Sequence, residues 1–431
     1  MDSLADDLLV EIFCRLPCAE AVITCKCVCK QWLSLISKPQ LVARFIAHNL
    51  NNGHINSNNK KKHRNEELSS FTYIDQGENE DGNIFFFPTS PVFTSLDTTL
   101  DFIPSYENTA KSPVKIRSKC SDLILCSRLP PEEFSSRVLP EEPDLYICNP
   151  RSKQWIQLPT PSHKEHHCLT CFTCDPYYET GSSISLSTCR YSVCYGFVVS
   201  RSSSRVNQLE MKILSSETGV WKKAVLLSPK FVNFWSAKFR DCFTYNGMVH
   251  FCTDDGIIGF DTYNVSADGF IHGRVIQLPL HDGSNQCGGE YVGVSGGKIV
   301  LLVYCRCLMS QQQQQQQQQP QPDNTDVYSL RVWELKGYET GEWLMTRIVH
   351  LNDLVVEDSE IFESLVRRYR WNLLMIHPND ADVLLLILGE RMVECNLREK
   401  TWKSICSIPS SRKRLGLVFP WWPTPLKQLP W

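Results

Sequence analysis

Apolar residues recur at helical spacing along the first 48 residues, in three segments that prolines separate. Such spacing, three or four positions apart, is typical of one face of an amphipathic helix. In the first segment these residues are Leu8, Leu9, Ile12, Phe13 and Leu16. Pro17 ends this segment, a second helix is expected from Glu20 to Ile36, and Pro39 opens a third. The pattern therefore predicts three short helices.

The three predicted helices are too small to stand alone, because chains below about 40 residues rarely fold unaided. Apolar residues also lie on more than one side of the first two helices, which indicates a second docking surface. Either the rest of the chain or another protein must cover that surface.

The run from Leu4 to Pro17, followed by Cys27 to Ile36, resembles the F-box of plant F-box proteins. Its acidic pair, its Leu-Pro ending and the segment Val28-Cys29-Lys30-Gln31-Trp32 carry the resemblance. The resemblance implies a Skp1-type adaptor docked on this motif and, through it, a cullin-RING ubiquitin ligase. The family usually opens with Leu-Pro, whereas this chain has Leu4-Ala5. Because proline would pre-set the first helical turn, we expect a modest loss of adaptor affinity.

Adaptor contacts are expected along both halves of this motif. Some of these residues must instead form the core of the small helical domain, and the sequence does not divide the two sets. The expected contact residues are Leu4, Leu8, Leu9, Ile12, Leu16, Pro17, Val28, Cys29, Lys30 and Trp32.

From Phe71 onward the pattern changes to short strand-like runs that turns separate. A unit of strand, polar turn and second strand recurs five times, and four of the units carry a tryptophan after the turn. These are Trp155, Trp221, Trp343 and Trp402. Their spacing fits a repeat of roughly 50 to 65 residues, near the kelch period. A ring of four-stranded blades hides most sheet edges, so the repeat predicts a β-propeller.

The strand region also resembles the F-box-associated, kelch-like domain that follows the F-box in many plant proteins. Asn149-Pro150 ahead of Trp155 and the Gly-x-Trp hairpins carry this resemblance. We therefore expect a small all-α F-box of three helices, followed by an all-β propeller of six or seven kelch-like blades. The expected units are the F-box at 1–48, a polar and basic linker at 49–70, the propeller at 71–425 with a disordered poly-glutamine loop at 310–324, and a tail at 426–431.

Composition narrows the choice of partners and compartment. The net charge of −3 gives no electrostatic case for nucleic acid. No apolar run reaches the roughly 18 residues that a membrane helix needs, and the acidic start does not resemble a signal peptide. Twenty cysteines without an export signal indicate reduced thiols in the cytoplasm or nucleus. The basic run from Lys60 to Arg64 is either a nuclear import signal or a solvated linker.

The cysteine-rich run from His166 to Cys174 is the strongest candidate for a metal site, since zinc accepts four nitrogen or sulfur ligands. No second Cys-x-x-Cys pair follows at finger-like spacing. Residues three apart in a strand also point to opposite faces. We therefore expect buried or half-buried thiols, no metal and no cofactor. The chain has neither a phosphate-binding glycine loop nor a Gly-x-Ser-x-Gly elbow, so no catalytic residue is assigned.

Two other segments allow more than one interpretation. The aromatic run from Phe419 to Pro425 is typical either of a binding hot spot or of a last strand that closes the propeller ring, and we favour closure. The apolar spacing from Val355 to Tyr369 predicts a helix across one end of the ring.

The favoured function is a substrate-recognition subunit of an SCF-type (Skp1–cullin–F-box) E3 ubiquitin ligase. The F-box would dock the adaptor and the propeller would hold a target protein of unknown identity. The mechanism would be proximity, with no covalent chemistry in the chain itself. The alternatives are a propeller enzyme and a non-ligase scaffold that carries an F-box.

Overall fold

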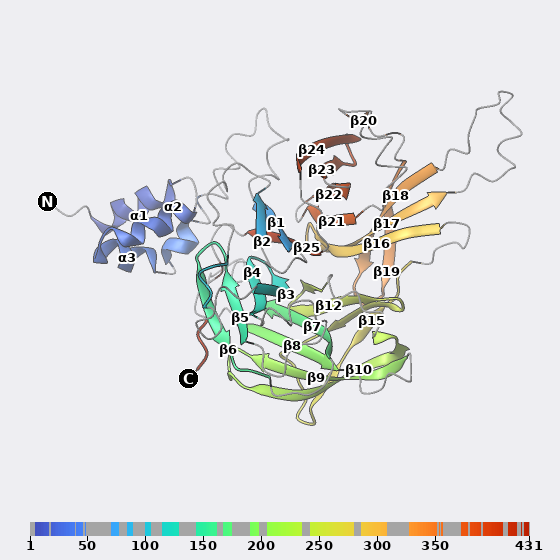
Figure 1. Cartoon of the computed structure of the whole chain (residues 1–431), viewed down its shortest axis with the longest axis horizontal. Helices are drawn as coiled ribbons and strands as arrows, with labels where there is room; N and C mark the ends of the chain where they lie inside the picture. Colours follow the sequence, from blue (N-terminus) through green and yellow to red (C-terminus); the bar gives the residue numbers. More distant parts are fainter. Residues whose placement is uncertain are drawn as a thin grey trace, which may run out of the picture.

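A computed structural model of the chain contains a group of helices followed by β-sheets (Figure 1). None of the helices in the described part is long and apolar enough to cross a membrane. The structure describes residues 5–16, 19–38, 40–45, 48, 70–76, 84–88, 100–104, 114–128, 144–161, 167–174, 190–197, 205–234, 242–279, 286–307, 327–350, 353, 355–356, 372–377, 380–388, 391–407, 413–419, 424 and 426–430.

The helical domain contains α1 (Asp6–Cys14), α2 (Ala19–Thr24), a 3₁₀ turn η1 (Cys25–Cys27) and α3 (Lys30–Ile36), and residues 40–45 are also helical. The second helix expected from the sequence is therefore two helices. The break lies at Cys29, whose extended backbone (φ −160°) leaves its thiol free to accept a hydrogen bond from the Trp32 amide at 3.5 Å. This thiol caps α3 at the place where serine or aspartate usually does so.

The first two blades follow the helical domain along the chain (Figure 1). We number the blades in chain order. The first blade consists of β3 (Val114–Cys120), β4 (Leu123–Arg128), β5 (Asp144–Asn149) and β6 (Gln154–Leu158). The second consists of β7 (His167–Cys174), β8 (Tyr191–Phe197), β9 (Val206–Ser215) and β10 (Trp221–Val232), with β14 (Phe270–His272) added in parallel to β10.

The next three blades repeat this antiparallel arrangement. The third has β11 (Phe243–Tyr245), β12 (Met248–Thr253), β13 (Gly256–Phe260) and β15 (Arg274–Ile276). The fourth has β16 (Gln286–Ser295), β17 (Lys298–Cys307), β18 (Val327–Gly337) and β19 (Glu342–His350). The fifth has β21 (Asn372–His377), β22 (Asp380–Leu388), β23 (Arg391–Asn396) and β24 (Thr401–Ser407), with β20 (Val355–Val356) parallel to β24.

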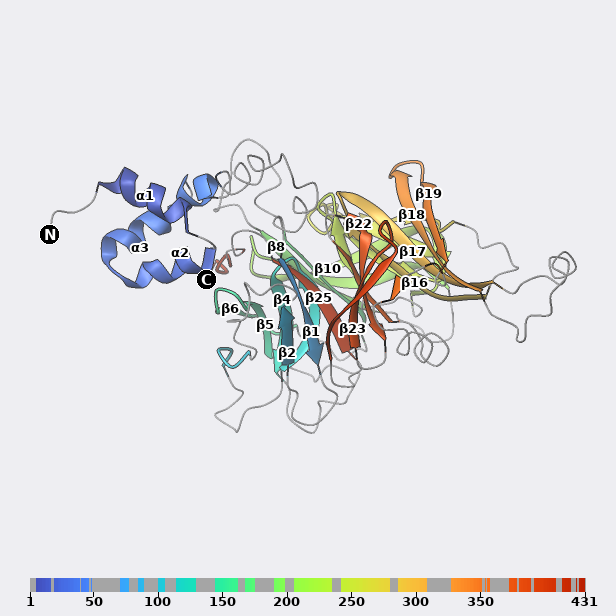
Figure 2. The same ribbon diagram turned by 90° about the horizontal axis from the view of Figure 1, so that it is seen from above.

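A three-stranded closing sheet joins the two ends of the β region (Figure 2). In it, β1 (Ser70–Gln76) lies between β2 (Ile84–Pro88) and β25 (Lys413–Phe419). The pairing of β1 with β25 is antiparallel and runs from Ser70 opposite Phe419 to Gln76 opposite Lys413. Within the described residues the β region thus has five blades of four or five strands and this closing sheet, which matches the expected six or seven blades only roughly.

All five hairpins expected from the sequence form, and the turns of the four that carry a tryptophan share one backbone feature. The residue two positions before each of the four tryptophans has a positive φ, between 55° and 69°. Glycine occupies this position at Gly219 and Gly341, while Lys153 and Lys400 occupy it in the other two turns. A left-handed residue here is what the turn requires, and glycine adopts it without a steric cost.

The hydrophobic core lies between neighbouring blades. One cluster joins the first and second blades, another the second and third, and two more continue this pattern to the fifth blade. Two of the repeated tryptophans reinforce these interfaces with hydrogen bonds. Trp221 Nε1 donates to the Pro159 carbonyl and Trp343 Nε1 to the Gln277 carbonyl, each at 2.8 Å. Each bond runs from an outer strand to the end of the preceding blade.

The helix expected from Val355 to Tyr369 is wrong at its start, because Val355 and Val356 form the parallel strand β20 beside β24. Two β-branched residues fit a sheet edge well, and pairing with β24 outweighs a spacing that also suits a helix. Most of that segment, residues 49–69 of the expected linker and the poly-glutamine loop at 310–324 lie outside the described residues, while Ser70 already belongs to β1.

Candidate functional site

The helical domain has a closed core of its own. In α1, Leu9 and Phe13 are 2% and 1% exposed. They pack with residues of α2, of α3 and of the helical turn at 40–45, and the Trp32 ring meets the Phe13 ring edge-on at 5.1 Å. The buried members of this cluster are Leu9, Phe13, Cys14, Ala19, Val22, Leu35, Ile36, Leu41, Val42 and Phe45.

Among the described residues of the same domain, four large apolar side chains are exposed to solvent. Leu8 and Ile12 are 55% and 47% exposed, and they lie one helical turn apart on the same side of α1. Val28, which follows η1, is 63% exposed, and Leu33 on α3 is 48% exposed. We call these four residues the exposed apolar set. The core of the domain is complete without these four side chains.

Polar contacts hold the helices that carry this set. Gln31 Nε2 at the start of α3 donates to Asp6 Oδ1 at the start of α1, at 2.9 Å. Glu11 of α1 accepts from Arg15 at 2.9 Å and from Arg44 at 2.8 Å. These guanidinium groups, Arg15 first, lower the pKa of the Glu11 carboxyl. Because these groups are largely exposed, the ion pairs orient the helices more than they stabilise them.

The structure divides the ten residues expected to contact an adaptor. Leu8, Ile12, Val28, Cys29 and Lys30 are exposed, whereas Leu16 and Trp32 are half-buried against the core. Leu9 is buried in the core. Leu4 and Pro17 lie outside the described residues. Exposed Leu33 was missed, although it lies outside the stripe of Trp32, Leu35 and Ile36 that packs on the core, and this position could have revealed it.

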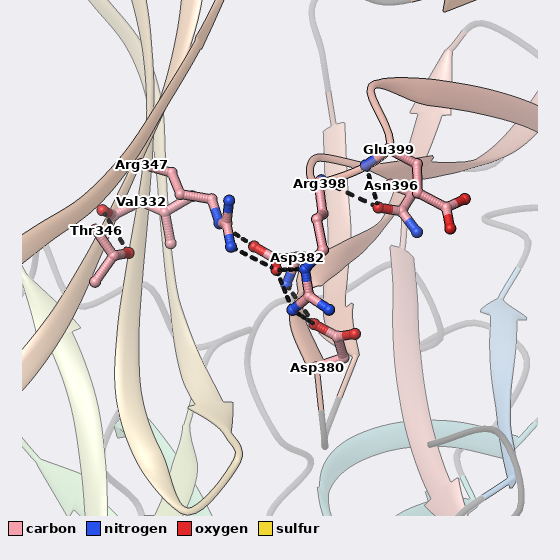
Figure 3. A network of polar contacts seen from close by, with 8 residues as sticks. All are labelled: Val332, Thr346, Arg347, Asp380, Asp382, Asn396, Arg398 and Glu399. Atoms are coloured by element: carbon pink, nitrogen blue, oxygen red, sulfur yellow. Dashed lines mark hydrogen bonds and ion pairs between the residues drawn. The ribbon is translucent and has the colours of Figure 1, made fainter. Parts of the chain in front are cut away.

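A polar network between the fourth and fifth blades is a second candidate site (Figure 3). Asp382 of β22 is 5% exposed and accepts from Arg347 of β19 at 2.8 Å and from Arg398 at 2.9 Å. Its carboxylate is therefore shared by two guanidinium groups from different blades (Figure 3). The network therefore joins the fourth and fifth blades.

His250 is the most buried histidine among the described residues and lies between the third and fourth blades. Its ring is fully buried, stacks on Phe243 and bonds the Tyr338 hydroxyl at 2.8 Å. Burial lowers the pKa of His250 to about 4. This histidine is a packing residue, because its ring is fully buried among aromatic side chains.

In the described part of the chain no group of three or more histidine, cysteine or acidic side chains is placed to hold a metal ion. Cys171 and Cys174 point to opposite faces of the second blade, as the strand spacing predicts, because each belongs to a different core cluster. The His166 residue and the Cys168 side chain lie outside the described residues.

The C-terminal segment packs against the first two blades. The Thr424 amide donates to the buried Asp122 carboxylate at 2.9 Å, and the Tyr191 hydroxyl donates to the Lys427 carbonyl at 3.2 Å. Burial raises the pKa of Asp122. Leu429 is buried in the cluster between these blades. Together with β25, these contacts fit the closing role, while Trp421 and Trp422 lie outside the described residues.

Two family models match the chain. A model described as "F-box domain" matches residues 1–44, and one described as "F-box protein At3g26010-like, beta-propeller" matches residues 97–415. The F-box protein At5g65850 from Arabidopsis thaliana is 27% identical over 161 residues, which are 36% of this chain and 31% of that protein. The chain thus spans about a third of the length of this curated relative.

Solved structures show only distant similarity. A protein from Lactobacillus plantarum matches with a TM-score of 0.36 and 8% identity, over 81% of this chain and all of that one. The WD40 domain of SCAP from fission yeast matches with a TM-score of 0.27 and 10% identity, over 72% of this chain and 67% of that one. Similarity at this level carries no functional argument.

Proposed function

Since the chain belongs to the F-box proteins with an At3g26010-like beta-propeller, we propose that it is the substrate-recognition subunit of an SCF-type E3 ubiquitin ligase. The F-box docks a Skp1-like adaptor, and through it a cullin-RING ligase. The propeller, whose blades we take to be kelch-like, binds the target protein.

The exposed apolar set is the observation that carries this proposal. Leu8, Ile12, Val28 and Leu33 remain about half exposed on a domain whose core is complete without them. Complete burial of such a side chain contributes about 1.5–3 kcal/mol, so covering the exposed half of four contributes on the order of 4 kcal/mol before association costs. Another protein that covers this set is the simplest reason for its exposure.

Proximity is the proposed mechanism. The receptor holds its target near a ubiquitin-charged enzyme and raises the effective concentration of the target lysines. The chain itself then needs no catalytic group. The propeller loops supply recognition, as loops on a rigid scaffold commonly do. Target recognition takes place in the cytoplasm, the nucleus or both.

The test replaces two members of the set while sparing the core. In Leu8→Asp/Ile12→Asp, two exposed side chains become charged, whereas changing buried Leu9 would unfold the domain. The matched control is Val220→Asp, since Val220 is 57% exposed but lies in a propeller turn. Binding of purified full-length protein to a recombinant Skp1-like adaptor is measured by titration calorimetry, and folding by circular dichroism.

We expect the double variant to lose at least about 100-fold in affinity, because two charges must be desolvated at the interface. Val220→Asp should bind as the wild type does. Equal affinity of all three folded proteins would refute the adaptor-binding assignment. A chain without residues 1–48 should then capture target proteins without delivering them for ubiquitination.

A further inference from the structure

Two pairs of cysteines flank β7, one on each face of the second blade. Cys174 Sγ lies 3.2 Å from Cys120 Sγ, and Cys171 Sγ lies 3.3 Å from Cys242 Sγ. Cys120 ends β3 and Cys242 immediately precedes β11. β3, β7 and β11 each stand at one end of their sheet, and β3 contacts β7. Both pairs therefore span a boundary between neighbouring blades.

Further contacts hold the backbones of these strands close together. The Cys174 amide donates to Cys120 Sγ at 3.3 Å, and the hydroxyls of Thr173 and Thr244 are 3.2 Å apart. A disulfide has an S–S distance of about 2.05 Å. Each pair of sulfurs thus needs to approach by little more than about 1 Å to reach this distance.

The two cysteines of each pair differ in burial. Cys120 and Cys242 are half-buried, whereas Cys174 and Cys171 are buried. The Cys174 thiol, as a hydrogen-bond partner, lowers the pKa of Cys120, which favours the reactive thiolate. By contrast, burial raises the pKa of Cys194 and of Cys395 to about 12, so these thiols are inert.

We propose that Cys120–Cys174 and Cys171–Cys242 are oxidation sites at which a hydroperoxide forms two disulfides that join the first three blades. The thiolate of the half-buried cysteine attacks one oxygen of the peroxide, breaks the O–O bond and becomes a sulfenic acid, and one water leaves. The buried thiol then attacks that sulfur, the S–O bond breaks, and a second water leaves with the thiol proton. Hydrogen peroxide is reduced to two waters as two thiols become one disulfide.

This proposal is independent of the ubiquitin-ligase proposal, and it changes the stability of the propeller. The linked residues are 54 and 71 positions apart, so each bond closes a long loop of the unfolded chain. Such cross-links stabilise mainly by restricting the unfolded state. Oxidation should therefore raise the melting temperature on the order of 5 °C, and a reducing agent should reverse the shift.

Trypsin separates the four cysteines into three peptides, 120–128, 165–190 and 241–274. Full-length reduced protein is treated with hydrogen peroxide, alkylated with N-ethylmaleimide, digested without reduction and analysed by mass spectrometry. Each end peptide carries a second cysteine as an internal control, Cys126 in the first and Cys252 in the last. The variants Cys120→Ser and Cys242→Ser are therefore compared with Cys126→Ser and Cys252→Ser.

We expect peroxide to link peptide 165–190 to both other peptides, with the loss of two hydrogen atoms per bond. Cys120→Ser should remove the first link and Cys242→Ser the second, while both control variants keep both links. Persistence of a link in the serine variant of its own pair would overturn the assignment of that pair. The proposal as a whole fails if the peptides stay separate after peroxide treatment that oxidises an exposed reference thiol such as Cys27.

Discussion

The buried imidazole of His250 makes the stability of the propeller depend on pH. The ring has no exposed surface and is enclosed by Phe243 and Tyr245 of β11, by Gly259 of β13 and by Tyr338 after β18. Its Nδ1 lies 3.1 Å from the Met248 carbonyl, which can only accept a hydrogen bond. Nδ1 therefore donates, and in the neutral ring Nε2 accepts from the Tyr338 hydroxyl.

The size of the effect follows from the two pKa values. Burial holds the pKa of His250 at about 4 in the folded protein, against about 6.5 in an unfolded chain. The folded state thus favours the neutral ring. The stability that the neutral His250 ring contributes is fully present above about pH 6.5 and is lost as the pH falls toward 4. Linkage gives a loss of about 2 kcal/mol between pH 7 and pH 5 from this residue alone.

Charged groups near the ring have limited influence on this shift. The Arg274 guanidinium lies 5.0 Å from the centre of the Tyr338 ring and pairs with Glu339. Because this pair is at the surface and each charge offsets the other, burial remains the dominant cause of the lowered pKa.

Denaturant titrations at pH 7 and pH 5 test this reasoning in the wild type and in His250→Gln. The glutamine variant should be less stable at pH 7, since it loses the ring contacts. Its stability should nevertheless fall by about 2 kcal/mol less than that of the wild type on acidification. His272→Gln is the control, because His272 is exposed on β14. Equal acid sensitivity of wild type and His250→Gln would refute the argument.

Four further substitutions probe turns and blade interfaces, and each is measured by the denaturant midpoint. Gly341→Ala should lower the free energy of unfolding by about 1 kcal/mol, because of its positive φ alone. Gly256→Ala should lower it clearly more, because a Cβ there would meet the Ile276 carbonyl oxygen at 2.5 Å. Equal losses of stability in the two variants would contradict the steric argument. Asp382→Ala should lower the free energy of unfolding by about 2 kcal/mol. This is less than the loss of a fully buried ion pair would cost, because both partner arginines reach solvent. An unchanged midpoint would contradict the proposed role of the carboxylate in joining the two blades. Trp343→Phe should lose about 1 kcal/mol with its hydrogen bond to Gln277, and no loss would show that water replaces that bond.

The hairpins could be predicted because their signals are local. A left-handed turn position followed two residues later by tryptophan, as at Gly219 and Trp221, depends on neighbours in the sequence. The added strand β14 could not be predicted in the same way. It pairs in parallel with β10, from Val225 opposite Phe270 onward, across more than forty residues. The sequence of a three-residue segment does not indicate which distant strand it will pair with.

The division of α1 between core and surface was likewise out of reach. Leu8 and Leu9 are the same residue type in adjacent positions, yet they are 55% and 2% exposed. Spacing alone predicts an apolar helix, but it does not say which side of the helix meets its neighbours. Here the contacts of Leu9 and Phe13 with α3 and with residues 40–45 decide the matter.

The pairing of β1 with β25 has a consequence for synthesis of the protein. A ribosome makes β1 more than three hundred residues before it makes the partner that completes the closing sheet. Throughout that interval the nascent chain carries one unpaired strand edge, a surface that readily adds a foreign strand. A premature stop codon between Ser407 and Lys413 would leave that edge unpaired permanently. Such products should be captured by chaperones and degraded, even though all five blades have already been translated.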